Sequence, residues 1–128
     1  MKIEISNGEL MDRITILDIK SKRLENDVKR SNAEKERDAL LSLLKSIWFG
    51  QQSKEYIELK KLNEQLWDII DEAKIIIKFV NNPDNKQLTL RFIELSIRTI
   101  QLNDKRYLIK KKIDEMTNSN FKELKKDL

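Results

Sequence analysis

Hydrophobic positions along most of this chain recur at steps of three and four, which is the spacing of amphipathic α-helices. The clearest stretch is residues 56–80, YIELKKLNEQLWDIIDEAKIIIKFV. One apolar row in it has a single gap, at Asn63, and a second row lies beside it. A helix that is apolar over so wide an arc needs neighbours on several sides, so we expect it to be the central helix of a bundle. The two rows are Tyr56, Leu59, Leu66, Ile70, Ala73, Ile77 and Val80, and Leu62, Ile69 and Ile76.

Two more helices are predicted before this one. Ser6 followed three residues later by Glu9 is a capping box, which marks a helix start. The apolar spacing after it predicts a first helix over residues 7–29. A polar run follows, so we expect a turn near Ser31 and a second helix over residues 33–49.

The third and fourth predicted helices are the longest. The third should cover residues 53–80 and end before a segment that contains the one proline of the chain. Either Asn82 or Asp84 should cap the fourth helix, which should cover residues 85–116. A short amphipathic segment over residues 119–128 is predicted to form a further, loosely docked helix.

Short turns between long helices place successive helices antiparallel. The predicted fold class is therefore all-α: an antiparallel bundle of about four long helices plus a short C-terminal helix. No internal repeat or low-complexity linker divides the chain, so we expect one helical-bundle domain over residues 1–128. Up-and-down order brings the start of the first helix, the start of the third and the end of the fourth to one end of the bundle, here called the pole.

The composition agrees with this fold and excludes several kinds of chemistry. The 128 residues include 2 Gly and 1 Pro, and 38% of them are charged, which is typical of an all-helical protein. The absence of Cys and His removes thiol catalysis, Ser-His-Asp triads and the usual zinc ligands. No apolar run could cross a bilayer and no apolar signal segment opens the chain. We therefore expect a cytoplasmic protein with no membrane span, no metal and no cofactor.

The net charge of +4 is concentrated near the C-terminus. A basic segment at residues 105–126 could bind nucleic acid, but acidic residues interleave with the lysines, and the segment lacks the interleaved aromatic residues of single-strand binders. We therefore rank nucleic-acid binding third among the possible functions. Adjacent acids such as Asp114 and Glu115 point to different faces of a helix, so we expect them to face solvent rather than to act as an acid–base couple.

Several polar residues are predicted to meet at the pole. Asn63 and Arg106 occupy positions in otherwise apolar rows, so they should be at least partly buried and should need partners. Two interpretations stay open: a hydrogen-bonded network that fixes the packing, or a pocket for a small anionic ligand with Arg98 and Arg106 as its positive groups. The candidate ligand-binding residues are Asn7, Glu9, Asp12, Asn63, Trp67, Arg98, Asn103, Asp104 and Arg106.

Three blocks of the sequence resemble an uncharacterised family of small helical proteins, a domain of unknown function. The blocks are residues 5–12, 63–69 and 92–110, and they cover the first, third and fourth helices. The resemblance implies a small helical bundle with this polar pole but names no reaction, and it implies a microbial protein of bacteria or their phages. This chain has Ile70 and Lys74 where that family has an acidic residue and an arginine, so a site on that face is not carried over.

A second resemblance, to helical chorismate mutases, rests on residues 9–24 and on Glu36-Arg37-Asp38. Those enzymes need no His or Cys and hold a dianion with cationic side chains. The resemblance implies that Arg13 and Arg30 would bind such a substrate by positioning and electrostatics. The segment between these arginines and Glu36 is too short to place the family's intervening lysine.

Taken together, the residues favour a binding or protein–protein interaction module over an enzyme. The expected partner is another protein or a second copy of the chain. A homodimer is predicted because the helix over residues 85–116 carries two apolar rows, and a small bundle does not cover both. One row contains Ile93, Ile97, Ile100 and Tyr107. The alternative function is an arginine-based ligand-binding or enzyme bundle that acts on a small anionic substrate.

Overall fold

Four α-helices make up nearly all of the residues that the computed structural model describes, which are 5–44, 51, 53–79 and 85–117. The prediction of an all-α fold is confirmed, since no strand occurs among these residues. The predicted C-terminal helix at residues 119–128 lies outside them, as does the end of the predicted second helix. The helices are α1 (Asn7–Arg23), α2 (Asp27–Leu44), α3 (Lys54–Phe79) and α4 (Lys86–Met116).

Local capping signals set two of the helix starts. The backbone N–H of Glu9 donates a hydrogen bond of 3.1 Å to Ser6 Oγ, so α1 begins as the capping box predicts. The cap of α4 is Asn85, whose side chain accepts from the backbone N–H three residues on. The prediction of Asn82 or Asp84 as this cap is therefore wrong by one to three residues. An Asx side chain directly before the first helical residue satisfies one of the N–H groups that the helix leaves unpaired.

The turn between α1 and α2 comes earlier than predicted. α1 ends at Arg23, and Asn26 caps α2 by accepting a hydrogen bond of 3.0 Å from the backbone N–H of Lys29. The prediction of a turn near Ser31 is wrong. It assumed that a polar run marks a turn, but α2 packs against α1 alone and therefore contains long polar stretches. Only Ala33 and Leu44 are buried in it, so its polar first half is a solvated helix face rather than a loop.

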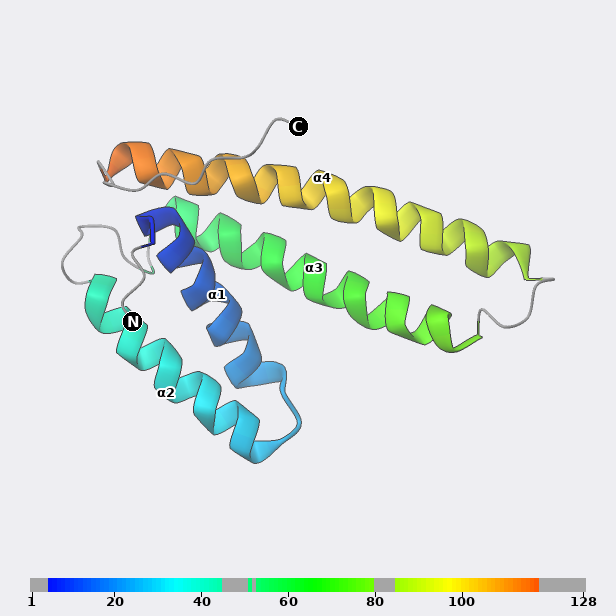
Figure 1. Ribbon diagram of the computed structural model, residues 1–128, viewed down its shortest axis with the longest axis horizontal. Coiled ribbons are helices and arrows are strands. Elements are labelled where there is room, and N and C mark those ends of the chain that lie inside the picture. The colour runs from blue at the N-terminus through cyan, green and yellow to red at the C-terminus, as the bar shows by residue number, and fades with distance from the viewer. Residues whose placement is uncertain (1–4, 45–50, 52, 80–84, 118–128) are drawn as a thin grey trace.

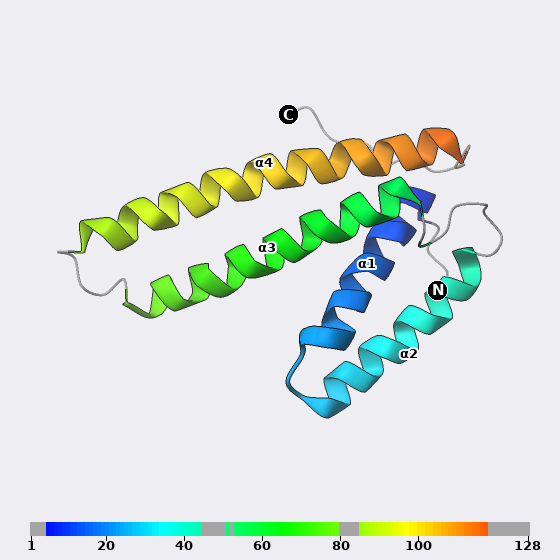
Figure 2. The ribbon, with the colours of Figure 1, turned by 180° about the vertical axis from the view of Figure 1, so that it is seen from behind.

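The helices form two hairpins that meet at one end and diverge (Figures 1 and 2). α1 and α2 form one hairpin, and α3 and α4 form the other. Among the four helices, α1 is the one that packs against all three others, whereas α2 packs against α1 alone. The prediction of α3 as the central helix is therefore wrong. Short side chains on α1, among them Gly8, Thr15 and Ser21, are buried and allow three neighbours to approach it.

The buried apolar side chains form two clusters. The first lies at the pole and contains residues of all four helices: Leu10, Met11, Ile14, Leu44, Tyr56, Leu59 and Ile113. The second runs between α3 and α4 and consists of Leu62, Leu66, Ile69, Ile76, Leu95 and Leu102. Beyond the pole, α3 and α4 are joined by this second cluster and by an exposed ion pair between Arg91 and Glu72. We call that part, residues 69–79 and 86–102, the distal arm; no third helix lies beside it (Figure 1).

Candidate functional site

The start of α1 is docked on the end of α4. The backbone N–H of Gly8 donates a 2.7 Å hydrogen bond to Asp114 Oδ1, and Asn7 Nδ2 donates one of 2.9 Å to Thr117 Oγ1. A Cβ at Gly8 would lie 2.3 Å from the carbonyl oxygen of Lys110, so a side chain here would force the two backbones apart. Asp114 is fully buried. The prediction that it faces solvent is wrong, because its carboxylate binds an N–H group at the positive end of α1.

The carboxylate of Asp12 joins three helices at the pole. Its Oδ1 accepts a hydrogen bond of 2.9 Å from Asn63 Nδ2 on α3, and its Oδ2 accepts one of 2.6 Å from Arg106 on α4. Asn63 Nδ2 also lies 2.7 Å from Thr15 Oγ1, and Arg106 donates to Asn103 Oδ1 at 2.9 Å. Asp12 is only 2% exposed. The two polar residues that interrupt apolar rows, Asn63 and Arg106, thus share one buried acid.

A second ion pair extends this cluster toward the start of α1. Lys110 Nζ lies 2.7 Å from Glu9 Oε2 and 3.9 Å from Asp12 Oδ2. Burial of the Glu9 carboxyl acts to raise its pKa, but the hydrogen bond and the charge of Lys110 outweigh burial, so the pKa lies below its ordinary value of 4.5. The carboxylates of Glu9 and Asp12 face the cations of Lys110 and Arg106. Among these four side chains, two negative charges face two positive ones.

Most of the nine candidate residues lie at the pole, but not all. Asp104 is exposed beside Asn103, and Trp67 is half-buried one helical turn beyond Asn63. Arg98 is exposed on the distal arm, two turns from Arg106, and makes no hydrogen bond or ion pair with the residues described. A ligand-binding role for the nine stays a prediction. Those that the structure joins to the pole by hydrogen bonds or ion pairs are Asn7, Glu9, Asp12, Asn63, Asn103 and Arg106.

A further buried acid, Asp18, was not predicted from the sequence. Its Oδ2 lies 2.7 Å from Lys60 Nζ on α3, and its Oδ1 accepts a 3.0 Å hydrogen bond from Arg37 on α2. Burial acts to raise the pKa of Asp18, but its contacts with Lys60 and Arg37 outweigh burial and lower the pKa below 3.8. The hydrogen bond with Asp18 raises the pKa of Lys60. The signal was available: Asp18 stands within the apolar run Ile16-Leu17-Asp18-Ile19, as Asn63 stands within its row.

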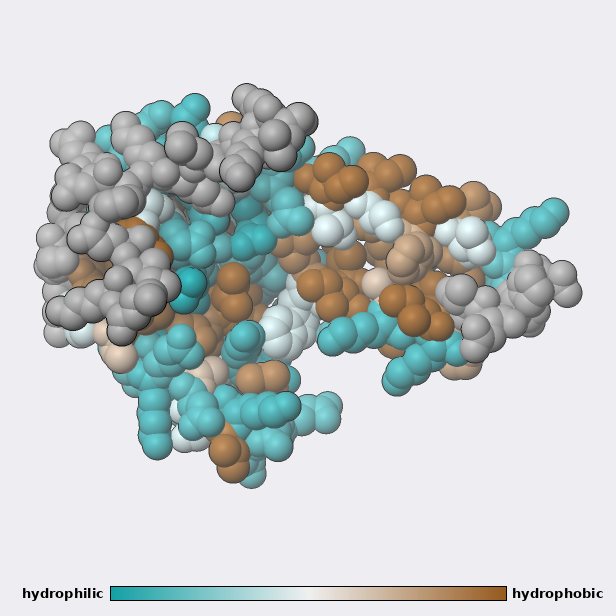
Figure 3. Space-filling model, in the orientation of Figure 1, coloured by the Kyte–Doolittle hydropathy of each residue, from teal (hydrophilic) through white to brown (hydrophobic). Residues whose placement is uncertain are grey.

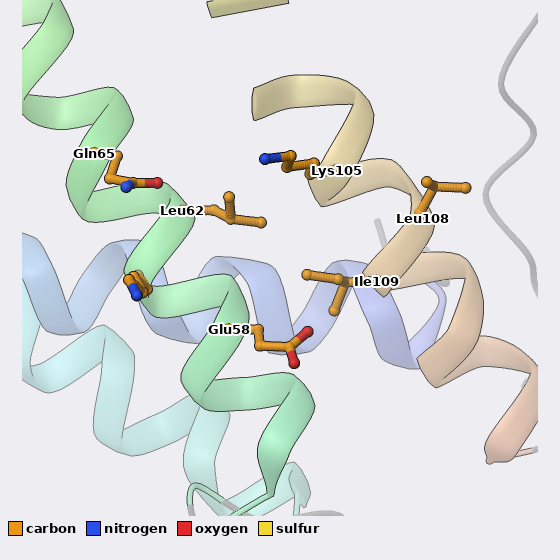
Figure 4. A pocket seen from close by; sticks show the side chains of 7 residues that line it. Glu58, Leu62, Gln65, Lys105, Leu108 and Ile109 are labelled. Carbon is orange, nitrogen blue, oxygen red and sulfur yellow. The ribbon is translucent and has the colours of Figure 1, made fainter. Parts of the chain in front are cut away.

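A shallow groove lies between α3 and α4 beside the pole, with a volume of about 430 Å³. In Figure 4, Leu62 of α3 and Ile109 of α4 point toward each other, and Glu58, Gln65 and Lys105 lie around them. An apolar floor with a polar rim suits an apolar side chain or a small amphipathic molecule. Lys61 and Leu108 complete the lining.

Metal-binding and membrane-spanning features were sought in the same residues. Within the part of the chain that the structure describes, no group of three acidic side chains is arranged to hold a metal ion. In that same part, none of the helices combines the length and the apolar character that crossing a bilayer requires.

The model of a family of unknown function, DUF6165, matches residues 1–127. The chain belongs to this family. The resemblance to an uncharacterised helical family is thereby confirmed for this member of DUF6165. No curated protein and no solved structure matches the chain. The family description assigns no activity, so the function of this DUF6165 protein has to be argued from its own surface and its own contacts.

The resemblance to chorismate mutases gains no support from these matches. Arg13 lies in the middle of α1 and pairs with Glu9, whereas Arg30 lies near the start of α2 and pairs with Asp27. Because α2 starts where α1 ends, the two arginines lie at different levels of this hairpin. The DUF6165 fold therefore does not bring them to one substrate.

Proposed function

We propose that this chain is a protein-interaction module and that the distal arm is its binding surface. Most of the large apolar side chains that are exposed among the described residues lie on the arm. Figure 3 shows apolar side chains gathered along the projecting part of α3 and α4, whereas the α1–α2 hairpin is mainly hydrophilic on that face. Those on the arm are Ile70, Ile75, Ile77, Phe79, Leu90, Phe92, Ile93, Ile97 and Ile100.

Exposure on this scale supports binding because the transfer of apolar side chains out of water into an interface lowers the free energy. Burying a whole Ile or Leu side chain contributes about 1.5–3 kcal/mol, and here Ile77 is 58% exposed and Ile97 is 53% exposed. Large apolar patches on soluble proteins commonly mark interaction sites. The arm is also thin, since one row of buried contacts joins its two helices. A partner would therefore stabilise the arm as well as bind to it.

The α3 face of the arm has the pattern of a helix-packing surface. At the pole, Leu59 and Asn63 are buried where α1 crosses α3, and Leu66 is buried against α4. The same row continues at steps of four and seven to Ile70 and Ile77, which are exposed because α1 turns away. Such a row, where no helix of this chain covers it, is suited to packing against a helix of a partner. The partner helix would lie on α3 next to the part that α1 covers.

The polar cluster at the pole supports the alternative function less well. A pocket for an anionic ligand needs cations that lack carboxylate partners. Here Arg106 and Lys110 already pair with Asp12 and Glu9 at 2.6 and 2.7 Å. An incoming anion would have to displace these carboxylates from a buried position, which is costly.

The proposal can be tested by photocrosslinking of the full chain in the cells that make it. Ile77 on α3 is replaced by a benzophenone amino acid, and Lys35, an exposed residue of α2, receives the same replacement as the control. We expect one or a few defined protein adducts from the arm position and none from the control. Mass spectrometry of the adducts then identifies the partner, including a second copy of the chain.

A second variant links the adducts to the arm surface. Ile70→Asp, on the same face as Ile77, should abolish them while the circular dichroism and the unfolding curve stay close to wild type, because Ile70 is 49% exposed. Crosslinks from Ile77, and from the equivalent replacement at Ile97, that match the Lys35 control in pattern and amount would refute the proposal.

A further inference from the structure

α4 carries a row of exposed residues on the side away from α3. Leu88, Leu95 and Leu102 face α3 and follow one another at steps of seven positions. The exposed row lies half a turn away from them and steps by four, three, four, three and four residues. Its apolar members are between 49% and 65% exposed. The row consists of Lys86, Leu90, Ile93, Ile97, Ile100 and Asp104.

We propose that this row pairs with the same row of a second copy of the chain, with the two α4 helices antiparallel. The proposal rests on the proposed function, in that it names one partner of the distal arm. Alternating steps of three and four are the seam of a coiled coil, whose complement is a helix with the same spacing. The row supplies that complement itself, because its order of steps is identical when read backwards.

The charges at the two ends of the row select the second copy and its direction. When the midpoint between Ile93 and Ile97 lies on the two-fold axis, Ile93 of one copy opposes Ile97 of the other. In the same register Leu90 opposes Ile100, and Lys86 opposes Asp104. The pairing therefore closes with an ion pair at each end, as an isologous interface requires. A parallel arrangement would place like charges together at both ends.

The residues beside the row also fit a second copy. Glu94 and Arg98 flank it on one side, and the antiparallel register places Glu94 of one copy between Glu94 and Arg98 of the other. Arg98 makes no ion pair with the described residues, so its guanidinium is available for this contact. Thr89, Ser96 and Asn103 flank the other side and carry no charge.

The size of the row sets the strength of the association. Each copy contributes four apolar side chains and two end charges, which is less than the standard interface of about 1,600 Å². Association also costs translational and rotational freedom. The expected dissociation constant is therefore on the order of 1–100 µM.

Sedimentation of the full chain over about 1–500 µM measures this association. Ile97→Asp should raise the dissociation constant at least tenfold. Ile77→Asp, an equally exposed substitution on α3, is the matched control and should leave it unchanged. Lys86→Asp and Asp104→Lys should each weaken pairing, whereas an equimolar mixture of the two variants should recover it, since opposite charges then meet at both ends. A wild-type monomer at all concentrations, or equal effects of Ile97→Asp and Ile77→Asp, would overturn the proposal.

The direction of pairing has its own test, because the chain contains no cysteine. Leu90→Cys mixed with Ile100→Cys should form a disulfide-linked dimer under mild oxidation. Leu90→Cys alone should not, because the antiparallel register separates the two copies of that residue by ten positions, about 15 Å. Efficient linkage of Leu90→Cys to itself would refute the antiparallel geometry. Photocrosslinks from Ile77 to another protein, with no dimer, would refute this pairing and leave the proposed function standing.

Discussion

The ion pair of Asp12 and Arg106 should contribute strongly to stability if the cluster at the pole is structural. Asp12 is almost completely buried, and Arg106 supplies its shortest contact, at 2.6 Å. The Arg106→Ala variant leaves the carboxylate with Asn63 and with Lys110, whose ammonium is 3.9 Å away. A buried charge that loses its partner is destabilising, because the carboxylate has already given up its hydration.

The size of the effect follows from burial. Removing one partner of a buried pair costs about 3–5 kcal/mol. The Arg106 side chain keeps 22% of its surface exposed, so water partly screens the site and we expect a loss of about 2–3 kcal/mol for Arg106→Ala. A cycle with Asp12→Ala and the double variant should give a coupling of about 1–2 kcal/mol.

Urea denaturation of the full chain measures these free energies of unfolding. The control is the double-mutant cycle of Arg91 and Glu72. These residues form a bidentate ion pair that is exposed to solvent, with the Arg91 guanidinium 2.8 and 3.1 Å from the two carboxylate oxygens of Glu72. It should show no coupling that the denaturation curves resolve. An Arg106→Ala variant as stable as wild type, or more stable, would refute the structural interpretation. Stabilisation of the wild type by phosphate or dicarboxylates, lost in that variant, would point instead to an anion site.

Two further predictions concern the packing of α1. Gly8→Ala should lower stability by about 3 kcal/mol in urea denaturation, because the new Cβ meets the Lys110 carbonyl oxygen; Arg13→Ala, an exposed change on the same helix, should be nearly neutral, and equal effects would contradict the close approach. Asp18 should make stability depend on pH in the acid range. Its pKa is lowered in the folded state, so its contribution is full above the unfolded value of about 3.8 and is lost as the pH falls through the folded value. Denaturation between pH 2 and 7 should therefore show a smaller acid-induced loss in Asp18→Asn than in wild type, and equal losses would contradict this role.

The sequence predicted the helices well where the signals are local. The capping residue Ser6 and the apolar periodicity of residues 54–79 depend only on residues that are close in sequence. They can therefore be recognised before the tertiary structure is known. The turn between α1 and α2 was misplaced because apolar spacing locates buried faces. α2 packs on one neighbour only and buries little, so the start of this helix left no apolar signal.

The relation between helices was less predictable. Apolar rows on α3 reveal how much surface could be buried, but not whether another helix covers it. The row of α3 is buried as far as Leu66, whereas Ile70 and Ile77 are exposed. The centrality of α1 depends on short side chains such as Gly8 and Thr15, which carry almost no hydrophobic signal. Their effect can be recognised only once the neighbouring helices that pack closely against them are known.

Polar residues within apolar rows were the most informative signal for the pole, since Asn63 and Arg106 both contact Asp12. Lys110 and Asp114 could not be assigned buried roles in this way, because they depend on where the start of α1 docks. Asp114, for example, is buried because it accepts from the N–H of Gly8.

These polar contacts also explain why the distal arm is uncovered. Three residues of α1 bind a partner on another helix: Gly8, Asp12 and Asp18. One position of α1 satisfies all three contacts at the same time. Sliding α1 along α3 to cover Ile70 would remove Asp12 from Asn63 and Arg106 and leave a buried carboxylate unpaired. Polar contacts of this kind can fix register more strongly than apolar packing does. The exposed rows of the arm therefore follow from a fixed position of α1.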